Sequence, residues 1–160
     1  MMSVTLLCVG KLREKWLKEA CAEYTKRLAA YCRLSIVELP EEKLPERPAE
    51  ALRTAALQRE AERVLAAVPQ GAALVALCIE GRLFSSEELS SRLTKWQTEG
   101  ESRLALVIGG SEGLDEAVKR RARLKLSMSP MTFPHHLARV LVLEQLYRAF
   151  SIAAGGKYHK

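Results

Sequence analysis

Three segments of the chain consist almost entirely of apolar residues: 4–9, 72–79 and 104–108. Runs of this kind are typical of strands that are buried on both faces, as in the middle of a parallel sheet. Residues 34–39 instead alternate between apolar and polar side chains, which indicates a strand nearer a sheet edge. A short fifth strand is predicted at 124–128. The pattern therefore predicts a largely parallel sheet.

Helical periodicity separates these strands. The segments in which apolar residues recur every three or four positions are 15–31, 49–68, 114–123 and 137–153. Another helix is predicted to open at the capping-box pair Ser85 and Glu88 and to stop at Gly100. The alternation of strands and helices indicates one doubly wound α/β domain, with helices on both faces of the sheet, that spans residues 1–160.

The helix at 137–153 is apolar over more than half of its circumference. A helix that packs on its own sheet needs to bury only one stripe. We therefore predict a second packing surface, most simply the same helix of a second copy in a homodimer. Residues 40–48 are rich in proline and charge and are predicted to form a mobile surface loop, for which a lid or substrate-contacting role is open.

The composition narrows the function classes. The chain has 160 residues, enough for one core, and its net charge of +6 suits a polyanionic partner, although a solvated basic face is the alternative. Four cysteines without a Cys-x-x-Cys pair argue against a disulfide framework or a zinc site and indicate a reducing compartment. No apolar run approaches the roughly 20 residues that span a bilayer, so a cytoplasmic protein without membrane association is expected.

Candidate chemistry begins after the apolar run at 104–108, where Ile-Gly-Gly-Ser-Glu-Gly (108–113) predicts a tight turn before a helix. Its three glycines leave main-chain groups uncovered, and Glu112 is the one ionisable residue in the turn. The spacing matches neither a dinucleotide fingerprint nor a P-loop, which argues against a phosphate-binding, nucleotide-dependent enzyme. From these residues alone, a ligand-binding turn and a turn needed only for chain geometry are both open.

The segment from Ser129 to His136 is a second unusual loop, with two prolines and two large apolar side chains. It suits either a ligand slot or core packing. The adjacent His135 and His136 are predicted to cap or orient the following helix, because no third ligand stands at metal spacing. The terminal Tyr-His-Lys (158–160), taken alone, is expected to be a frayed end.

Four motifs carry a family resemblance: I-G-G-S-E-G at 108–113, M-T-F-P-H at 131–135, L-E-Q-L-Y-R-A at 143–149, and the terminal Y-H-K. Together they closely resemble the ribosomal RNA large subunit methyltransferase H family of the SPOUT class, over essentially the whole chain. The resemblance implies a Rossmann-like parallel sheet with a C-terminal trefoil knot. It also implies S-adenosylmethionine-dependent methylation of N3 of a pseudouridine in the intersubunit hairpin of 23S rRNA, by a homodimer.

The resemblance assigns a site to the methyl donor, S-adenosylmethionine. Its contacts would be Leu77, Gly109, Met128, Ser129, Pro130, Met131, Thr132 and Phe133. An apolar slot with main-chain groups at its edge suits an adenine ring. An arginine at Gly109 is predicted to block this slot and to leave the fold intact. The chain departs from the family pattern at Pro130, which lacks an amide hydrogen, and at Lys157, where a proline commonly stands.

Methyl transfer from a sulfonium mainly requires alignment, but the N3–H of the acceptor must lose its proton. The resemblance directs this step to His159, Tyr158 and Arg148. His159 is the candidate whose unperturbed pKa lies near neutrality. Arg148 could hold phosphate or stabilise the developing anion, and Tyr158 could stack on the base or hydrogen-bond to it.

One domain leaves no residues for a separate RNA-binding module. We therefore expect the partner to be large-subunit rRNA within the assembled ribosome rather than naked rRNA, because a basic surface contacts phosphates without reading sequence. The rival class is a non-catalytic RNA- or ribosome-binding module on the same scaffold, which would not bind S-adenosylmethionine.

Overall fold

A single parallel sheet organises the fold. The computed structural model describes residues 1–160. Its five strands are β1 (Met2–Val9), β2 (Cys32–Leu39), β3 (Ala73–Leu83), β4 (Arg103–Ile108) and β5 (Leu124–Ser127). They lie in the order β2-β1-β4-β3-β5, and all four pairings are parallel. The predicted α/β class is confirmed, and the alternating strand β2 does lie at a sheet edge.

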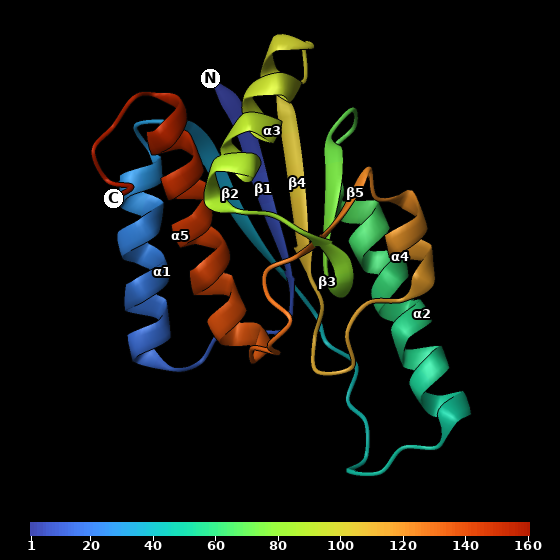
Figure 1. The fold of residues 1–160 in the computed structure, drawn as a ribbon. Coiled ribbons are helices and arrows are strands. Elements are labelled where there is room, and N and C mark those ends of the chain that lie inside the picture. The colour runs from blue at the N-terminus through green and yellow to red at the C-terminus, as the bar shows by residue number, and fades with distance from the viewer.

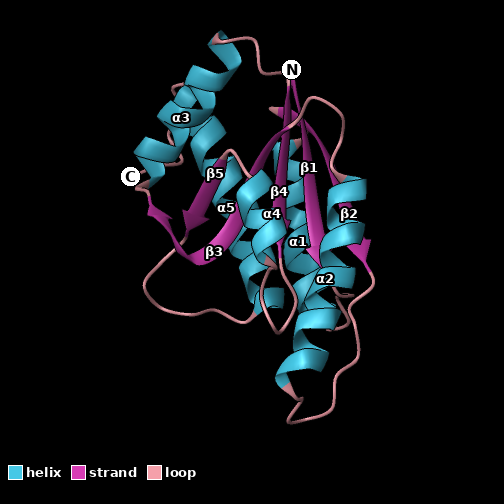
Figure 2. Cartoon of the chain, turned by 90° about the vertical axis from the view of Figure 1, so that its right-hand side faces the viewer, coloured by secondary structure: helices cyan, strands magenta, loops and turns pink.

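Helices cover both faces of the sheet (Figures 1 and 2). The helices are α1 (Lys15–Leu28), α2 (Glu50–Ala67), α3 (Ser86–Thr98), α4 (Glu116–Arg121) and α5 (His135–Ala153). Helices α1, α3 and α5 pack together on one face, and α2 packs with α4 on the other. None of them is long and apolar enough to cross a membrane.

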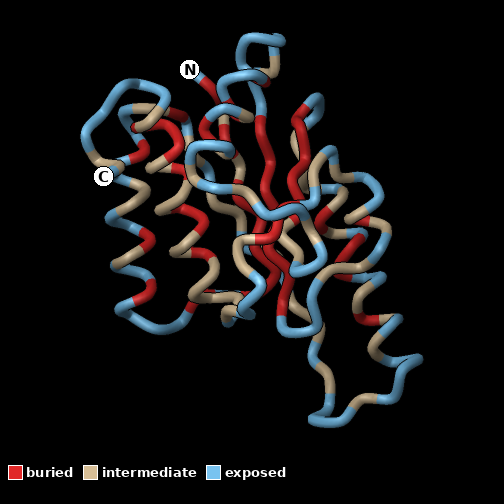
Figure 3. Tube along the Cα trace, in the orientation of Figure 1, coloured by how far each residue is buried: buried red, intermediate tan, exposed pale blue.

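The apolar runs lie at the centre of the molecule because both faces of the sheet are covered. Successive side chains of a strand point to opposite faces. In β1, Leu6 therefore joins the core beneath α1 and α5, whereas Leu7 joins the core beneath α2. The same alternation places Leu106 and Val107 of β4 in opposite cores. Figure 3 shows the buried residues concentrated in these central strands.

Several helices and strands begin or end a few residues away from their predicted boundaries. Helix α1 ends at Leu28 rather than at 31, because Ala29–Tyr31 form the turn that precedes β2. Strand β3 continues beyond the apolar run to Leu83, and Leu77 and Arg82 both pair with Leu126 across an irregularity. The predicted capping box is confirmed: Ser85 Oγ accepts the amide of Glu88, whose carboxylate accepts the amide of Ser85.

Helix α5 uses more than one stripe within its own chain. It packs against the sheet and against both α1 and α3. This contact accounts for part of the apolar surplus that the sequence assigned to a second copy. The homodimer and the C-terminal knot stay predictions.

An ion pair between a buried arginine and a partly exposed glutamate fixes the N-terminal half of α5. The Arg139 side chain is 4% exposed, and its Nη1 donates to Glu38 Oε2 at 2.7 Å. Partial burial raises the pKa of Glu38, but the hydrogen bonds from Arg139 and from the Leu12 amide lower it by a larger amount. The pKa of Glu38 is therefore below its usual range. Because Arg139 Nη2 also donates to the Gly10 carbonyl, this pair ties α5 to the ends of β1 and β2.

Candidate functional site

A cleft of about 430 Å³ lies at the carboxyl ends of β3, β4 and β5. In parallel α/β sheets, this edge is where ligands commonly bind. Of the positions that the resemblance assigned to the methyl donor, the structure places all but Pro130 in its wall: Leu77, Gly109, Met128, Ser129, Met131, Thr132 and Phe133. Pro130 is exposed and does not line the cleft. We call this hollow the glycine-turn cleft.

The glycine turn is closed by its own backbone. The Gly113 amide donates to the Gly110 carbonyl at 3.1 Å, and Gly113 has φ +82°. A Cβ atom at Gly109 would lie 2.4 Å from the Gly113 carbonyl oxygen. Any side chain at Gly109 would therefore force the turn to move. An arginine at Gly109 would therefore displace the turn as well as fill the slot, because the obstacle is backbone rather than a movable side chain. That the fold as a whole survives this substitution stays a prediction.

A carboxylate from a distant loop fixes the turn from outside. Glu41 Oε1 accepts hydrogen bonds from the Ser111 amide at 2.8 Å and from Ser111 Oγ at 2.9 Å. Next to it, Glu42 pairs with Arg63 Nη2 at 3.0 Å. The loop at 40–48 is thus a surface loop, as predicted, but its first residues are anchored. The turn's own Glu112 pairs with Arg53 Nε at 2.9 Å.

The loop that precedes α5 forms the opposite wall of the cleft. Ser129 Oγ accepts the Met131 amide at 3.0 Å, while the Met131 side chain is 75% exposed. His135 also lines the cleft, and its Nε2 is buried without a hydrogen-bond partner. Burial, and then the neighbouring His136, lower the pKa of His135. Both histidines lie in the first turn of α5, where no side chain forms a cap. The capping alternative is therefore wrong, and an orienting role stays a prediction.

A larger, open hollow of about 940 Å³ lies beside the turn, at the ends of β1 and β2. Only two of its 14 lining residues are hydrophobic, and charged side chains such as Lys11, Glu38 and Lys43 make up much of the rest. Half of the 20 residues around the glycine-turn cleft are hydrophobic. The smaller cleft is therefore the better site for an aromatic ring.

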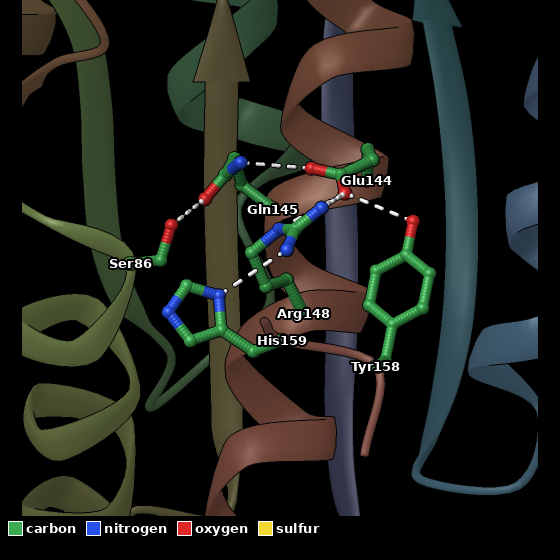
Figure 4. A network of polar contacts seen from close by, with 6 residues as sticks. All are labelled: Ser86, Glu144, Gln145, Arg148, Tyr158 and His159. Carbon is green, nitrogen blue, oxygen red and sulfur yellow. Dashed lines mark hydrogen bonds and ion pairs between the residues drawn. The ribbon is translucent and has the colours of Figure 1, made fainter. Parts of the chain in front are cut away.

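The three predicted catalytic residues meet on the surface of α5, in a group that we call the tail cluster: Glu144, Arg148, Tyr158 and His159 (Figure 4). Arg148 Nε donates to Glu144 Oε1 at 3.0 Å, and Tyr158 Oη donates to the same oxygen at 3.1 Å. Arg148 Nη1 lies 3.2 Å from His159 Nδ1. Tyr158 and His159 are thus held in place, as the resemblance implied and contrary to the frayed end expected from these residues taken alone.

The partners of His159 determine its tautomer. A guanidinium can only donate, so Arg148 requires an unprotonated Nδ1. The other ring nitrogen, Nε2, lies 2.6 Å from Glu87 Oε1, and a carboxylate oxygen can only accept a hydrogen bond, so Nε2 carries the hydrogen. These contacts favour the tautomer that carries its hydrogen on Nε2. Its Nδ1 lone pair becomes free for another proton only when Arg148 shifts.

Tyr158 is held in its protonated form. Burial, and then hydrogen bonding with Tyr24 and Glu144, raise the pKa of Tyr158 to about 12. The phenol therefore donates a hydrogen bond at neutral pH and does not act as a base. Its ring packs against Tyr147 with centroids 4.7 Å apart and beneath the Arg148 guanidinium, also at 4.7 Å. Hydrogen bonding to Glu144 raises the pKa of Arg148, which stays cationic.

Sequence reasoning missed the acidic members of this arrangement. Glu144 precedes Arg148 by four residues, a spacing that places two side chains on one helix face and could have identified the pair. No local signal points to Glu87, which lies 72 residues from His159. The same holds for Ser86, whose Oγ donates to Gln145 Oε1 at 2.7 Å and links α3 to the cluster (Figure 4).

The glycine-turn cleft and the tail cluster are neighbours but do not share a cavity. None of the four cluster residues lines the cleft. Between them lies a small cavity of about 40 Å³, whose wall includes Leu77 and Met128 from the cleft and Gln145 from α5. Within one chain, the predicted donor contacts and the predicted catalytic residues thus stay separate.

No group of three or more His, Cys, Asp or Glu side chains is arranged to hold a metal ion.

Comparisons with known proteins agree with this architecture. A family model described as "Predicted SPOUT methyltransferase" matches residues 2–159. Proteins named ribosomal RNA large subunit methyltransferase H from Clostridium novyi and Bacillus pumilus are 50% and 48% identical to the chain; each alignment covers 99% of this chain and all of the relative. A solved structure titled a probable methylase family protein from Haemophilus influenzae has the same fold, with TM-score 0.57 and 16% identity over 99% of this chain and 71% of that one. On the strength of the full-length matches, the chain belongs to the SPOUT methyltransferase family.

Proposed function

We propose that the chain is a single-domain, S-adenosylmethionine-dependent rRNA methyltransferase. In its finer form, the proposal is methylation of N3 of a pseudouridine in the intersubunit hairpin of 23S rRNA. The observation that carries it is the pairing of an apolar cleft at the strand ends with a proton-transfer cluster next to it. The names of relatives that are 46–50% identical over their full length support rRNA as the substrate.

The cleft has the chemistry that the donor requires. Leu77, Met128 and Phe133 supply apolar surface for an adenine ring, and the glycine turn supplies main-chain groups at its edge. A Cβ atom at Gly113 would meet nothing within 4 Å, which leaves open space beside the turn. The residues present therefore fit S-adenosylmethionine, which when bound supplies an electrophilic methyl group.

The tail cluster then handles the proton and the charge. We assign His159 as the proton acceptor for N3–H, through the Nδ1 lone pair that Arg148 occupies in this structure. Arg148, released from that contact, is placed to stabilise the developing anion or to hold a phosphate. Glu144 orients both Arg148 and Tyr158, and Tyr158 donates a hydrogen bond or stacks on the base.

A homodimer would bring cleft and cluster together. Because they do not share a cavity within one chain, the proton acceptor of one protomer could meet the donor cleft of its partner. Some side chains of α5, among them Leu141, remain half-buried and are available for such a contact. We therefore retain the homodimer as part of the proposal.

The test measures methyl incorporation from labelled S-adenosylmethionine into three substrates: ribosomes, protein-free rRNA and a synthetic hairpin. The ribosomes come from cells that lack this protein. We expect efficient incorporation into ribosomes and little into either RNA, with the label mapping to one pseudouridine. Efficient methylation of the isolated hairpin would refute the dependence on assembly. No incorporation into any substrate, together with no donor binding in calorimetry, would favour a non-catalytic RNA-binding module.

A further inference from the structure

Two arginines gather on one aromatic ring near the tail cluster. The Cζ of Arg82, at the end of β3, lies 4.7 Å from the ring centroid of Phe84, and the Cζ of Arg92, on α3, lies 5.7 Å from it. The Phe84 ring packs against the main hydrophobic core and is therefore fixed. Cation–π attraction holds guanidinium groups against such a ring while their N–H edges stay free. We call these three residues the arginine platform.

The acidic groups around the platform are bound to other partners. Glu88 accepts the Ser85 amide in the capping box, and Glu87 pairs with His159. Lys95, the other cation of this surface, lies 3.7 Å from Glu99. Glu87 and Glu88 line the same hollow, but neither Arg82 nor Arg92 forms an ion pair with a carboxylate, so both guanidinium groups can donate hydrogen bonds to a ligand.

The platform also borders a hollow. Arg82, Phe84 and Arg92 line an open depression of about 330 Å³ in which Phe84 is the single hydrophobic residue. A polar hollow edged by guanidinium groups suits a phosphate, because the planar fork of arginine matches two phosphate oxygens. Bases that are not paired also stack on guanidinium planes, which is typical of single-stranded RNA recognition.

The position of the platform connects it with both parts of the candidate site. Glu87 lines the same hollow and contacts His159 Nε2 at 2.6 Å. On its other side, Phe84 lines the small cavity that Leu77 and Met128 share with the glycine-turn cleft. A phosphate held on the platform would thus lie beside the proton acceptor and near the donor cleft.

We propose that Arg82, Phe84 and Arg92 bind the sugar-phosphate backbone of an unpaired RNA segment that flanks the target nucleotide. The inference rests on the proposed function, since it takes rRNA as the substrate. It gives the chain a phosphate contact within its one α/β fold.

The test compares the double variant Arg82→Ala/Arg92→Ala with a control, Lys18→Ala/Arg33→Ala. The control removes two exposed cations from α1 and from β2 at the opposite sheet edge. We expect the platform variant to bind a fluorescent hairpin RNA about tenfold more weakly. The slope of log K against log salt should flatten by about 1.4, since each phosphate contact to a single strand contributes about 0.7. The control should change neither quantity.

Two further measurements separate RNA binding from other roles. In the ribosome assay, the platform variant should raise KM about tenfold and leave kcat and donor affinity within about twofold. Phe84→Leu keeps apolar packing but removes the ring, so it should weaken RNA binding about threefold with an unchanged salt slope. Circular dichroism on each variant monitors the fold.

An unchanged salt slope in the double variant would overturn the inference. So would weaker binding to ribosomes with undiminished affinity for RNA, which would identify an acidic protein segment as the partner. The two proposals fail in different assays. If the proposed function is wrong, the wild-type protein methylates none of the three substrates. The RNA-binding comparison between the platform variant and its control still tests the arginine platform in that case.

Discussion

The glycine-turn cleft and the tail cluster differ in the kinds of groups that form them. The cleft is made of strand ends, a closed glycine turn and apolar side chains, and its shape is fixed by backbone contacts such as that between Gly110 and Gly113. The cluster is made of charged side chains on the surface of α5 and of a phenol and an imidazole from the terminal segment. This difference suggests separate roles: the cleft binds a ligand that fits its shape, and the cluster accepts a proton and stabilises charge.

The largest expected effect comes from removing the cluster's terminal residues. Deletion of Tyr158 to Lys160 should reduce methyl transfer to ribosomes by about 1000-fold, because general base catalysis contributes about 10² to 10⁴ in rate. Donor affinity in calorimetry should change less than twofold, since these residues do not line the cleft. The variant Lys160→Ala is the matched control and should retain turnover. Lost donor binding in the deletion would contradict the separation of cleft and cluster.

A charge on α5 tests whether a second copy joins the two regions. Leu141 is half-buried in the single chain, and a partner helix would bury it further. Leu141→Glu should then cost about 3 to 5 kcal/mol of dimer or folding stability, because an unpaired charge would be buried. Light scattering measures the mass, and Gln97→Glu at an exposed position of α3 is the control. A monomer mass for the wild type would remove the homodimer from the proposal.

The cleft itself can be weakened without disturbing the fold. Met131 lines the cleft, yet its side chain is 75% exposed, so Met131→Ala should not alter thermal stability. It should weaken S-adenosylmethionine binding about tenfold, equivalent to about 1.4 kcal/mol of lost apolar contact. Leu83→Ala removes a similarly exposed apolar side chain of β3 outside the cleft and should bind normally. Equal affinities of the two variants would argue against this donor site.

The smallest effect concerns the phenol of the cluster. With its pKa raised to about 12, Tyr158 remains protonated throughout the working pH range. Tyr158→Phe should therefore lower turnover about fivefold, through one lost hydrogen bond worth about 1 kcal/mol, without changing the shape of the pH–rate profile. If the variant instead lost a basic limb of that profile below about pH 10, Tyr158 would ionise during catalysis.

The candidate site was predictable in part, and the limits have physical reasons. The residues of the cleft wall came from motifs that are contiguous in the chain, and the structure gathers nearly all of them in one hollow. The contacts that fix those residues are not contiguous: Glu41 lies 70 residues from Ser111. A carboxylate in a charged loop looks like any solvated side chain until the fold brings it to its partner. Pro130 differs from its neighbours, because it is exposed to solvent while they line the cleft.

What the sequence determined by itself is the set of elements and the class of fold. Burial on both faces requires the continuous apolar runs of β1, β3 and β4, and a half-exposed helix requires its three- and four-residue spacing, so these patterns are local consequences of the final environment. The tertiary structure alone decided the strand order β2-β1-β4-β3-β5, the end of β3 at Leu83 and the pairing of Glu87 with His159. These features depend on which distant segments meet, because long-range contacts are set by the packing of whole elements and leave no periodic trace along the chain.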